Sequence, residues 1–161
     1  IAQHPYIIAS YLWNTFDFAV PMWERGGVPA RNLKGLVTFD RKIKKDSYFW
    51  YKANWSKDPV LYLTQRRNVN REKKETSVTV YSNIGTPTVY LNGKELTGVR
   101  KGYTDVHYIF DKVILNQGKN ILKTTVSYQG KEYTDEIEWV YNEEHKRETD
   151  SFENKKEHAG W

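Results

Sequence analysis

The sequence contains no cysteine, and no apolar run in it approaches the roughly 20 residues that a membrane-spanning helix needs. The absence of cysteine excludes disulfide bonds and thiolate metal sites, and it fits either the cytoplasm or the periplasm. The opening stretch, IAQHPYIIASYLW, lacks both a basic segment and a small-residue cleavage site, so it does not resemble a signal peptide. From the sequence we therefore expect neither a membrane segment nor a thiol-based metal site.

The chain also has only a small excess of positive over negative charge. The formal net charge is +5, but residues 142–161 hold four of the 25 basic residues and six of the 20 acidic ones, which leaves +7 on the rest. Those basic residues are spread over 41–45, 66–74 and the later hairpins, whereas a nucleic-acid-binding protein usually gathers them on one face. The charge pattern therefore does not predict a nucleic-acid partner.

Aromatic residues, by contrast, are plentiful: the chain has six Trp, 12 Tyr and six Phe among its 161 residues. Each aromatic side chain buries roughly 150–250 Å² in a core, so the apolar surface is bulky although the hydrophobic fraction is only 39%. We expect one folded domain, with or without an appendage, and disorder only at the C-terminal end.

The part of the chain after Pro59 predicts a β-sandwich of the immunoglobulin type. Asn92-Gly93 and Gln129-Gly130 are dipeptides that favour tight hairpin turns. Apolar and polar residues alternate in the segments between such turns, as in YTDEIEWVY at 133–141. Short antiparallel strands at this spacing are typical of the immunoglobulin fold. The predicted strands are 60–66, 76–82, 88–96, 106–115, 120–128 and 133–141.

The first third of the chain predicts an incomplete unit. Residues 6–13, YIIASYLW, have the mostly apolar pattern of a buried strand, and a long loop rich in proline and glycine follows them. Residues 44–55 predict a short helix that places Tyr48, Tyr51 and Trp55 on one face. Because one strand and one helix cannot bury both faces of a sheet, this part is expected to lean on a larger barrel.

Two stretches, YLWNTFDFA (11–19) and NLKGLVTFDRKIKKDSYFWYKANW (32–55), resemble the end of the catalytic barrel in glycoside hydrolase family 2. The resemblance is strongest to the bacterial β-galactosidases, with the β-glucuronidases as close cousins. It implies that residues 7–13 form the eighth barrel strand and that 44–55 belong to the eighth helix. The implied fold is mainly β: the last βα unit of a (β/α)8 barrel in 1–57, an immunoglobulin-like β-sandwich in 58–142 and a charged tail in 143–161.

The resemblance also implies three substrate-binding residues. In the family, the tryptophan at the position of Trp13 forms an apolar wall against the sugar, at the face where barrel enzymes place their sites. Asn32 and Lys34 match the Asn-x-Lys-Gly pattern that β-glucuronidases use against the uronate carboxylate, but galactosidases of this kind share the spacing. The alternatives are a core position for Trp13 and an ion pair between Lys34 and a carboxylate of the protein.

No catalytic residue, metal ligand or cofactor is predicted in this chain. Retaining glycosidases need two carboxyl groups about 5–5.5 Å apart, which the family places upstream of residue 1. Asp17, Glu24 and Asp40 match neither of the catalytic motifs. Because a whole barrel takes roughly 250 residues, we expect a C-terminal fragment that hydrolyses nothing on its own.

The remaining candidates are expected to be structural. Asp40 and Arg41 are predicted to form an ion pair or a cap near the helix. Trp23 and Glu24 belong to the long loop, where they are either exposed or border the aglycone. The histidines show no metal-binding spacing. They are His4, His107, His145 and His158.

Three functions stay open at this point. The first is a part of a retaining exo-β-galactosidase that acts on β-linked galactosides or related oligosaccharides. A β-glucuronidase is the rival within this class. In either case, we expect this part to pack against the missing N-terminal domains. The second is a non-catalytic sandwich that spaces domains or binds carbohydrate on a platform of tyrosines. The third, an anion- or nucleic-acid-binding module, rests on charge alone. Family habit places such enzymes in the periplasm or outside the cell. The platform residues would be Tyr62, Tyr90, Tyr103 and Tyr108.

Overall fold

The computed structural model describes residues 4–22 and 28–144, and the chain divides into two compact units, Ile1–Tyr48 and Phe49–Trp161. Four residues considered above, Trp23, Glu24, His145 and His158, lie outside the described residues, as does most of the predicted charged tail. The described part is mainly β with one short helix, as the sequence predicts.

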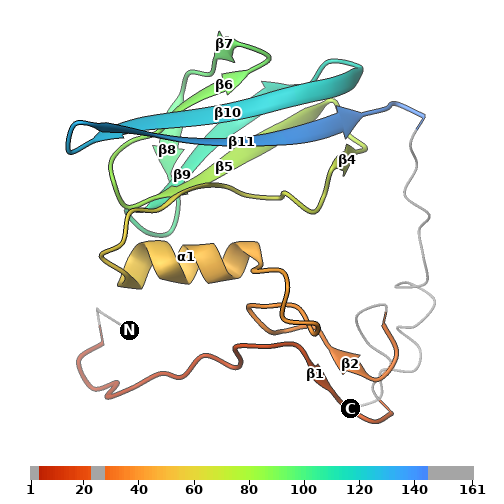
Figure 1. Ribbon diagram of the computed structural model, residues 1–161, viewed down its shortest axis with the longest axis vertical. Coiled ribbons are helices and arrows are strands. Elements are labelled where there is room, and N and C mark those ends of the chain that lie inside the picture. The colour runs from red at the N-terminus through yellow and green to blue at the C-terminus, as the bar shows by residue number, and fades with distance from the viewer. Residues whose placement is uncertain (1–3, 23–27, 145–161) are drawn as a thin grey trace. The chain divides into compact units, whose positions relative to one another are not determined.

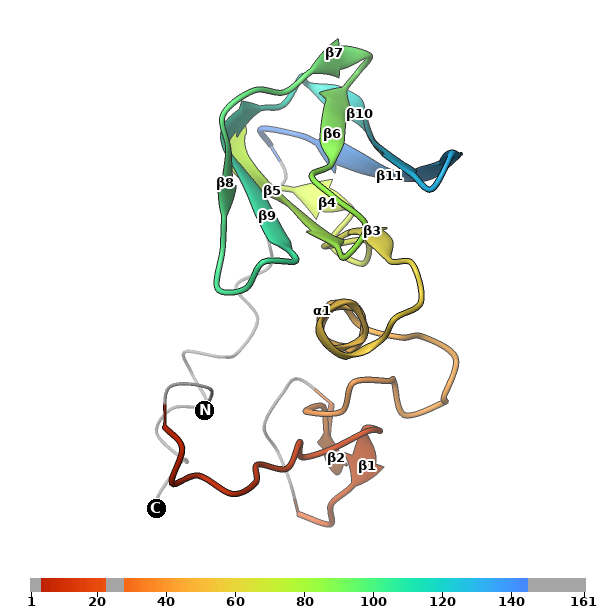
Figure 2. The ribbon, with the colours of Figure 1, turned by 90° about the vertical axis from the view of Figure 1, so that its left-hand side faces the viewer.

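The second unit is a β-sandwich of two sheets, shown in two views at right angles in Figures 1 and 2. Neighbouring strands are antiparallel, except that β4 pairs with β11 in parallel. The first sheet runs β4 (Asn70–Arg71), β11 (Lys131–Tyr141), β10 (Gly118–Tyr128), β6 (Thr88–Leu91) and β7 (Lys94–Glu95). The second runs β3 (Leu61–Leu63), β5 (Glu75–Ser82), β9 (His107–Ile114) and β8 (Val99–Lys101).

Alternating side chains of the two sheets form the core of the sandwich. In β11 the apolar residues Ile137, Trp139 and Tyr141 are buried, while Glu136 and Glu138, which precede Ile137 and Trp139, are exposed. This confirms the period-two pattern predicted for 133–141, since successive residues of a strand point to opposite faces. The same core takes fully buried residues from both sheets, namely Leu63, Val80, Val89, Leu115 and Leu122.

Both predicted hairpin turns are present. The Asn92-Gly93 turn joins β6 to β7, with backbone φ of 51° and 82°, and the Gln129-Gly130 turn joins β10 to β11, with φ of 50° and 74°. Positive φ at both central residues is the requirement of the turn that matches the twist of antiparallel strands. The turns therefore fix the register of Tyr128 against Lys131 and of the ladder behind them.

The structure also differs from the predicted strands. The strand predicted at 60–66 ends at Leu63, because the chain turns at Gln65, whose φ is +62°. The N–H of Leu63 donates to Asp135 Oδ2 at 2.7 Å, a contact that the local sequence does not reveal. The short strands β4 and β8 were not predicted, since neither has an alternating pattern.

The helix α1 (Asp46–Trp55) begins two residues later than predicted and spans the boundary between the units. Asp46 in its first turn and Lys52 in its last turn suit the helix dipole. In the second unit, Phe49 stacks on Tyr62 with ring centroids 3.8 Å apart, and Ala53 is buried against the same cluster. The helix therefore packs through Phe49 and Ala53, while Trp55 of the predicted aromatic face stays exposed.

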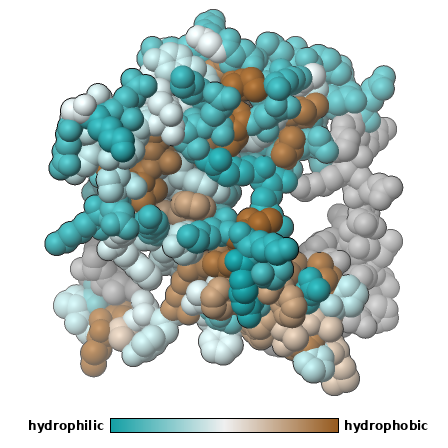
Figure 3. Space-filling view, viewed as in Figure 1, coloured by the Kyte–Doolittle hydropathy of each residue, from teal (hydrophilic) through white to brown (hydrophobic). Residues whose placement is uncertain are grey.

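The strand predicted at 6–13 is not formed, which corrects that prediction for the chain as it stands. Residues 7–12 have no strand pairing, and Ile8 and Tyr11 are 99% and 93% exposed. A strand of a parallel barrel needs a neighbour on each side for its backbone hydrogen bonds, and the described residues offer none. Apolar side chains consequently lie at the surface of the first unit (Figure 3).

His107, the first residue of β9, is expected to make the stability of the sandwich depend on pH. Its ring packs edge-on against Tyr81, and its Nδ1 accepts the Tyr103 backbone N–H at 3.3 Å. Burial, together with the positive charge of Arg100, lowers the pKa of His107 below its ordinary value. The folded state therefore binds the proton less readily than the unfolded state, so stability is full above the unfolded pKa of about 6.5 and falls as the pH drops through and below it.

We expect the free energy of unfolding, measured by urea titration of the chain, to decrease between pH 8 and pH 5. The matched control is His107→Asn, whose side-chain oxygen can still accept the Tyr103 N–H but does not titrate in this range. Its stability should depend less on pH than that of the wild type. Identical pH profiles for the two proteins would show that His107 contributes nothing to the acid sensitivity.

Candidate functional site

The first unit brings two segments of the predicted site together. Strand β1 (Phe18–Ala19) pairs with β2 (Arg31–Asn32), with Phe18 opposite Asn32. Beyond this pair, Asp17 N–H donates to Val37 C=O at 2.9 Å, and Leu36 N–H donates to Asn14 C=O at 3.1 Å. These backbone bonds hold the segment that follows Trp13 beside the segment that carries Asn32 and Lys34.

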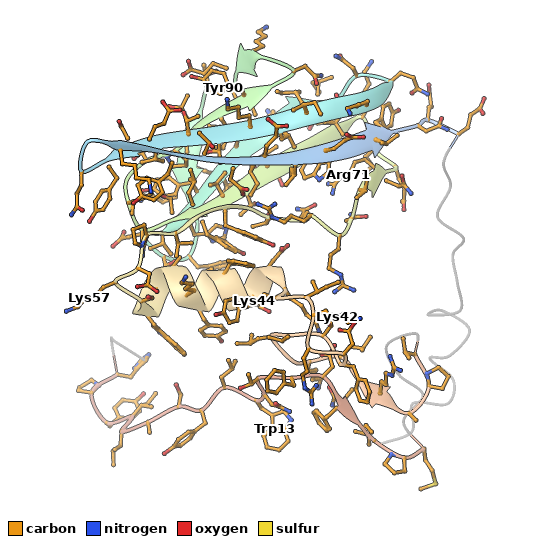
Figure 4. The ribbon with its side chains drawn as sticks, viewed as in Figure 1. Trp13, Lys42, Lys44, Lys57, Arg71 and Tyr90 are labelled. Atoms are coloured by element: carbon orange, nitrogen blue, oxygen red, sulfur yellow. The ribbon has the colours of Figure 1, made fainter. Side chains whose placement is uncertain are left out.

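Trp13 lies at the surface and not in a core. Its indole is 72% exposed and meets Phe18 edge to face, with centroids 6.0 Å apart. Figure 4 shows the side chain at the outside of the first unit. The Trp13–Asn14 peptide bond is cis. A core position for Trp13, the alternative considered above, is therefore not what the described residues show.

Asn32 and Lys34 differ in their surroundings. Asn32 is buried, and its Oδ1 accepts the backbone N–H of Lys34 at 2.9 Å. The side chain of Lys34 is exposed, and within residues 4–22 and 28–144 it has no ion pair with a carboxylate. An amide that fixes the backbone and an ammonium left facing solvent suit the capture of an anionic group.

Asp17 is a buried residue whose contacts sequence reasoning missed. Its side chain is 3% exposed, and its Oδ1 lies 2.6 Å from Lys45 Nζ and accepts the Gly35 N–H at 2.9 Å. Gly35 is packed so closely that a Cβ added to it would lie 2.1 Å from the backbone of Phe16 and Asp17. The partners are 18 and 28 residues from Asp17, so no local motif indicates them.

The predicted ion pair between Asp40 and Arg41 is not formed in the described structure, where both residues bind other groups. Arg41 Nη1 donates to the C=O groups of Asp17 and Phe39, at 3.0 and 2.8 Å, and the guanidinium lies 4.2 Å from the centroid of the Phe16 ring. Asp40 Oδ1 accepts the Thr38 hydroxyl at 2.5 Å, and this bond, with others, lowers the pKa of Asp40.

The four tyrosines of the second unit do not share one exposed surface. Tyr62 and Tyr108 are buried, Tyr90 is half-buried and Tyr103 is 95% exposed. Tyr62 packs between Phe49 and Tyr81, and Lys101 Nζ lies 3.7 Å from the centre of the Tyr108 ring. A flat aromatic platform of the kind that binds sugars is thus not formed by these four residues.

The described residues contain no cluster of three or more His, Asp or Glu side chains that could hold a metal ion. None of the helices in that part of the chain has the length and apolarity to cross a membrane.

Comparison with known proteins finds relatives that are named as glycosidases, whereas no family model matches the chain. The chain is 35% identical over 145 residues to a β-glucuronidase of Bacteroides fragilis. The matched residues make up 89% of this chain and 21% of the relative. It superposes with a TM-score of 0.88 and 77% identity on the crystal structure of a "putative beta-galactosidase" from Bacteroides fragilis, over 93% of this chain and 22% of that one.

A third relative is the crystal structure of an FMN-binding β-glucuronidase from Faecalibacterium prausnitzii L2-6, with a TM-score of 0.74 and 42% identity over 88% of this chain and 21% of that one. The chain therefore spans about a fifth of the length of the relatives it matches. Its homologues are glycoside hydrolases.

Proposed function

We propose that this chain is a part of a retaining glycoside hydrolase that removes terminal β-linked glucuronate. The observation that carries the proposal is Lys34. Its backbone is fixed by the buried Asn32, and its ammonium is exposed without a carboxylate partner among the described residues. A charge-assisted contact with the uronate carboxylate is the chemistry that this arrangement offers.

Trp13 has a complementary part in this function. The exposed indole of Trp13 offers an apolar surface to the C–H face of a pyranose. Catalysis itself needs a pair of carboxyl groups about 5–5.5 Å apart. In the first unit, Asp17 is buried and bound to Lys45, and Asp40 is bound to Thr38 and Lys42. We therefore assign substrate binding to this chain and the two carboxyl groups to residues outside it.

A terminal β-galactoside is the second candidate substrate. It is favoured by the 77% identity to the protein named a "putative beta-galactosidase". A galactoside carries no charge, so the ammonium of Lys34 would contribute only hydrogen bonds to sugar hydroxyls. The two candidates therefore differ in how much each depends on Lys34.

In the full-length protein, Lys34→Ala is expected to lower kcat/KM for an aryl glucuronide about 10- to 150-fold, because a hydrogen bond to a charged group contributes about 1.5–3 kcal/mol. Cleavage of the matching galactoside or glucoside should change little. The comparison uses steady-state kinetics on the three aryl glycosides. Lys42→Ala is the matched control, since Lys42 is an exposed lysine of the same unit.

Two outcomes would contradict the glucuronidase proposal. The first is a wild-type enzyme that prefers the galactoside, which would favour the second candidate. The second is a Lys34→Ala variant that loses the same factor on every substrate, which would show that Lys34 supports the fold rather than the uronate.

A further inference from the structure

The buried pair of Asp17 and Lys45 is unusual for so small a unit. The side chains are 3% and 17% exposed, and the two charged atoms lie 2.6 Å apart. Withdrawing two charges from water costs free energy that their attraction does not reliably return, so such a pair is weak evidence of a contribution to stability. The positions of its other hydrogen bonds point to a different role.

Both members of the pair bind the backbone on either side of Lys34. Asp17 Oδ1 accepts the N–H of Gly35 at 2.9 Å, and Lys45 Nζ donates to the C=O of Leu33 at 2.8 Å. Together with the bond from Lys34 N–H to Asn32 Oδ1, three consecutive residues are held through their main chain by side chains. The side chain of Lys34 takes no part in these bonds and stays exposed.

Asp17 and Lys45 are themselves held by hydrogen bonds of their backbone. Arg41 donates to the C=O of Asp17, and the N–H of Lys45 donates to the C=O of Leu36 at 2.8 Å. The two residues that bind the loop are thus themselves fixed to the backbone of neighbouring segments. A loop held in this way loses little further entropy when the exposed side chain of Lys34 meets a ligand.

We propose that Asp17 and Lys45 are positioning residues that hold the loop Asn32–Gly35 so that Lys34 meets the carboxylate of an anionic sugar. The inference rests on the proposed function and extends it to two residues that do not touch the substrate. A purely structural pair would instead lower stability and reduce cleavage of every substrate by one common factor.

The decisive variant is Lys45→Met in the full-length protein, with Lys44→Met as the matched control. Methionine keeps much of the apolar stem but removes the ammonium that binds Asp17 and Leu33. Lys44 is its exposed neighbour, with its ammonium 4.9 Å from the centre of the Tyr48 ring.

Because small displacements of a binding group cost up to about 100-fold in rate, we expect the KM of Lys45→Met for the aryl glucuronide to rise roughly tenfold or more. The neutral glycoside should be affected much less, and Lys44→Met should behave like the wild type.

A double-mutant cycle tests whether Lys45 acts through Lys34. In a Lys34→Ala background, Lys45→Met should cause no further loss on the glucuronide, since the group that it positions is already absent. Independent, multiplicative losses from the two substitutions would overturn the inference. So would an equal loss on the neutral glycoside.

A second variant guards against simple misfolding. Asp17→Asn/Lys45→Met leaves no unpaired buried charge, and it keeps an amide oxygen for Gly35 while Leu33 loses its donor. It should fold with a thermal midpoint close to the wild type and still show the raised KM for the glucuronide. If it regains the wild-type KM, the pair does not position the loop.

Amide hydrogen exchange separates failure of this inference from failure of the proposed function. Faster exchange at Gly35 in Lys45→Met than in Lys44→Met is expected whatever the substrate is. Unchanged exchange would overturn the positioning role even in an active glucuronidase. If Gly35 exchanges faster in Lys45→Met but the wild type cleaves no glucuronide, the positioning of the loop is supported and the assigned substrate is overturned.

Discussion

Replacing Gly35 with alanine is expected to lower cleavage of an aryl glucuronide by the full-length protein by about 100-fold or more. An added Cβ would lie 2.1 Å from both Asp17 N and the carbonyl carbon of Phe16. Real Cβ atoms do not approach other heavy atoms so closely, and backbone atoms cannot rotate away as a flexible side chain can. The loop must therefore move off the segment that follows Trp13, and the hydrogen bond from Gly35 to Asp17 must break.

The measurement is kcat/KM on the glucuronide, together with the thermal midpoint of the protein. Gly98→Ala is the control: Gly98 lies in the second unit at φ +78°, and a Cβ there meets nothing within 4 Å. It should lose some stability from backbone strain and keep full activity. If Gly35→Ala retained most of its activity, Lys34 would not need the loop position described here, and the positioning inference would fail with it.

The sandwich was predictable because its information is local. The long strands are indicated by alternating apolar and polar residues, as at Ile137, Trp139 and Tyr141 in β11. The hairpins are indicated by dipeptides that tolerate positive φ. The strands that were not predicted lack such local information. Strand β8 is an exposed edge, Val99–Lys101, and nothing in three exposed residues distinguishes a strand from a loop.

The first unit was less predictable because its structure depends on distant partners. A barrel-like apolar pattern at 6–13 forms no strand in this chain, since no neighbouring strand is described beside it. The resemblance indicated Trp13, Asn32 and Lys34, and their substrate contacts stay a prediction. Asp17 was set aside because it matches no catalytic motif, whereas its buried contacts with Gly35 and Lys45 appear only in the folded structure.

Trp139 is the largest fully buried side chain among the described residues. The indole is 1% exposed, packs among residues of both sheets and lies beneath the guanidinium of Arg71, 4.1 Å from the ring. Its Nε1 is buried without a hydrogen-bond partner among the described residues. The ring thus contributes through apolar burial and the cation–π contact rather than through its N–H.

Trp139→Ala is therefore expected to lower the free energy of unfolding by about 3–5 kcal/mol, the usual cost of removing a buried aromatic side chain. Since a domain of this kind is stabilised by only about 5–15 kcal/mol in total, a loss of this size removes a substantial share of its stability. Urea denaturation followed by far-ultraviolet circular dichroism measures the loss.

Trp139→Phe should lose less stability, because phenylalanine keeps much of the apolar surface and removes the unpaired N–H. Tyr103→Ala, at a 95% exposed position, should change stability by less than about 0.5 kcal/mol. A loss from Trp139→Ala as small as that of Tyr103→Ala would mean that the two sheets are held together elsewhere.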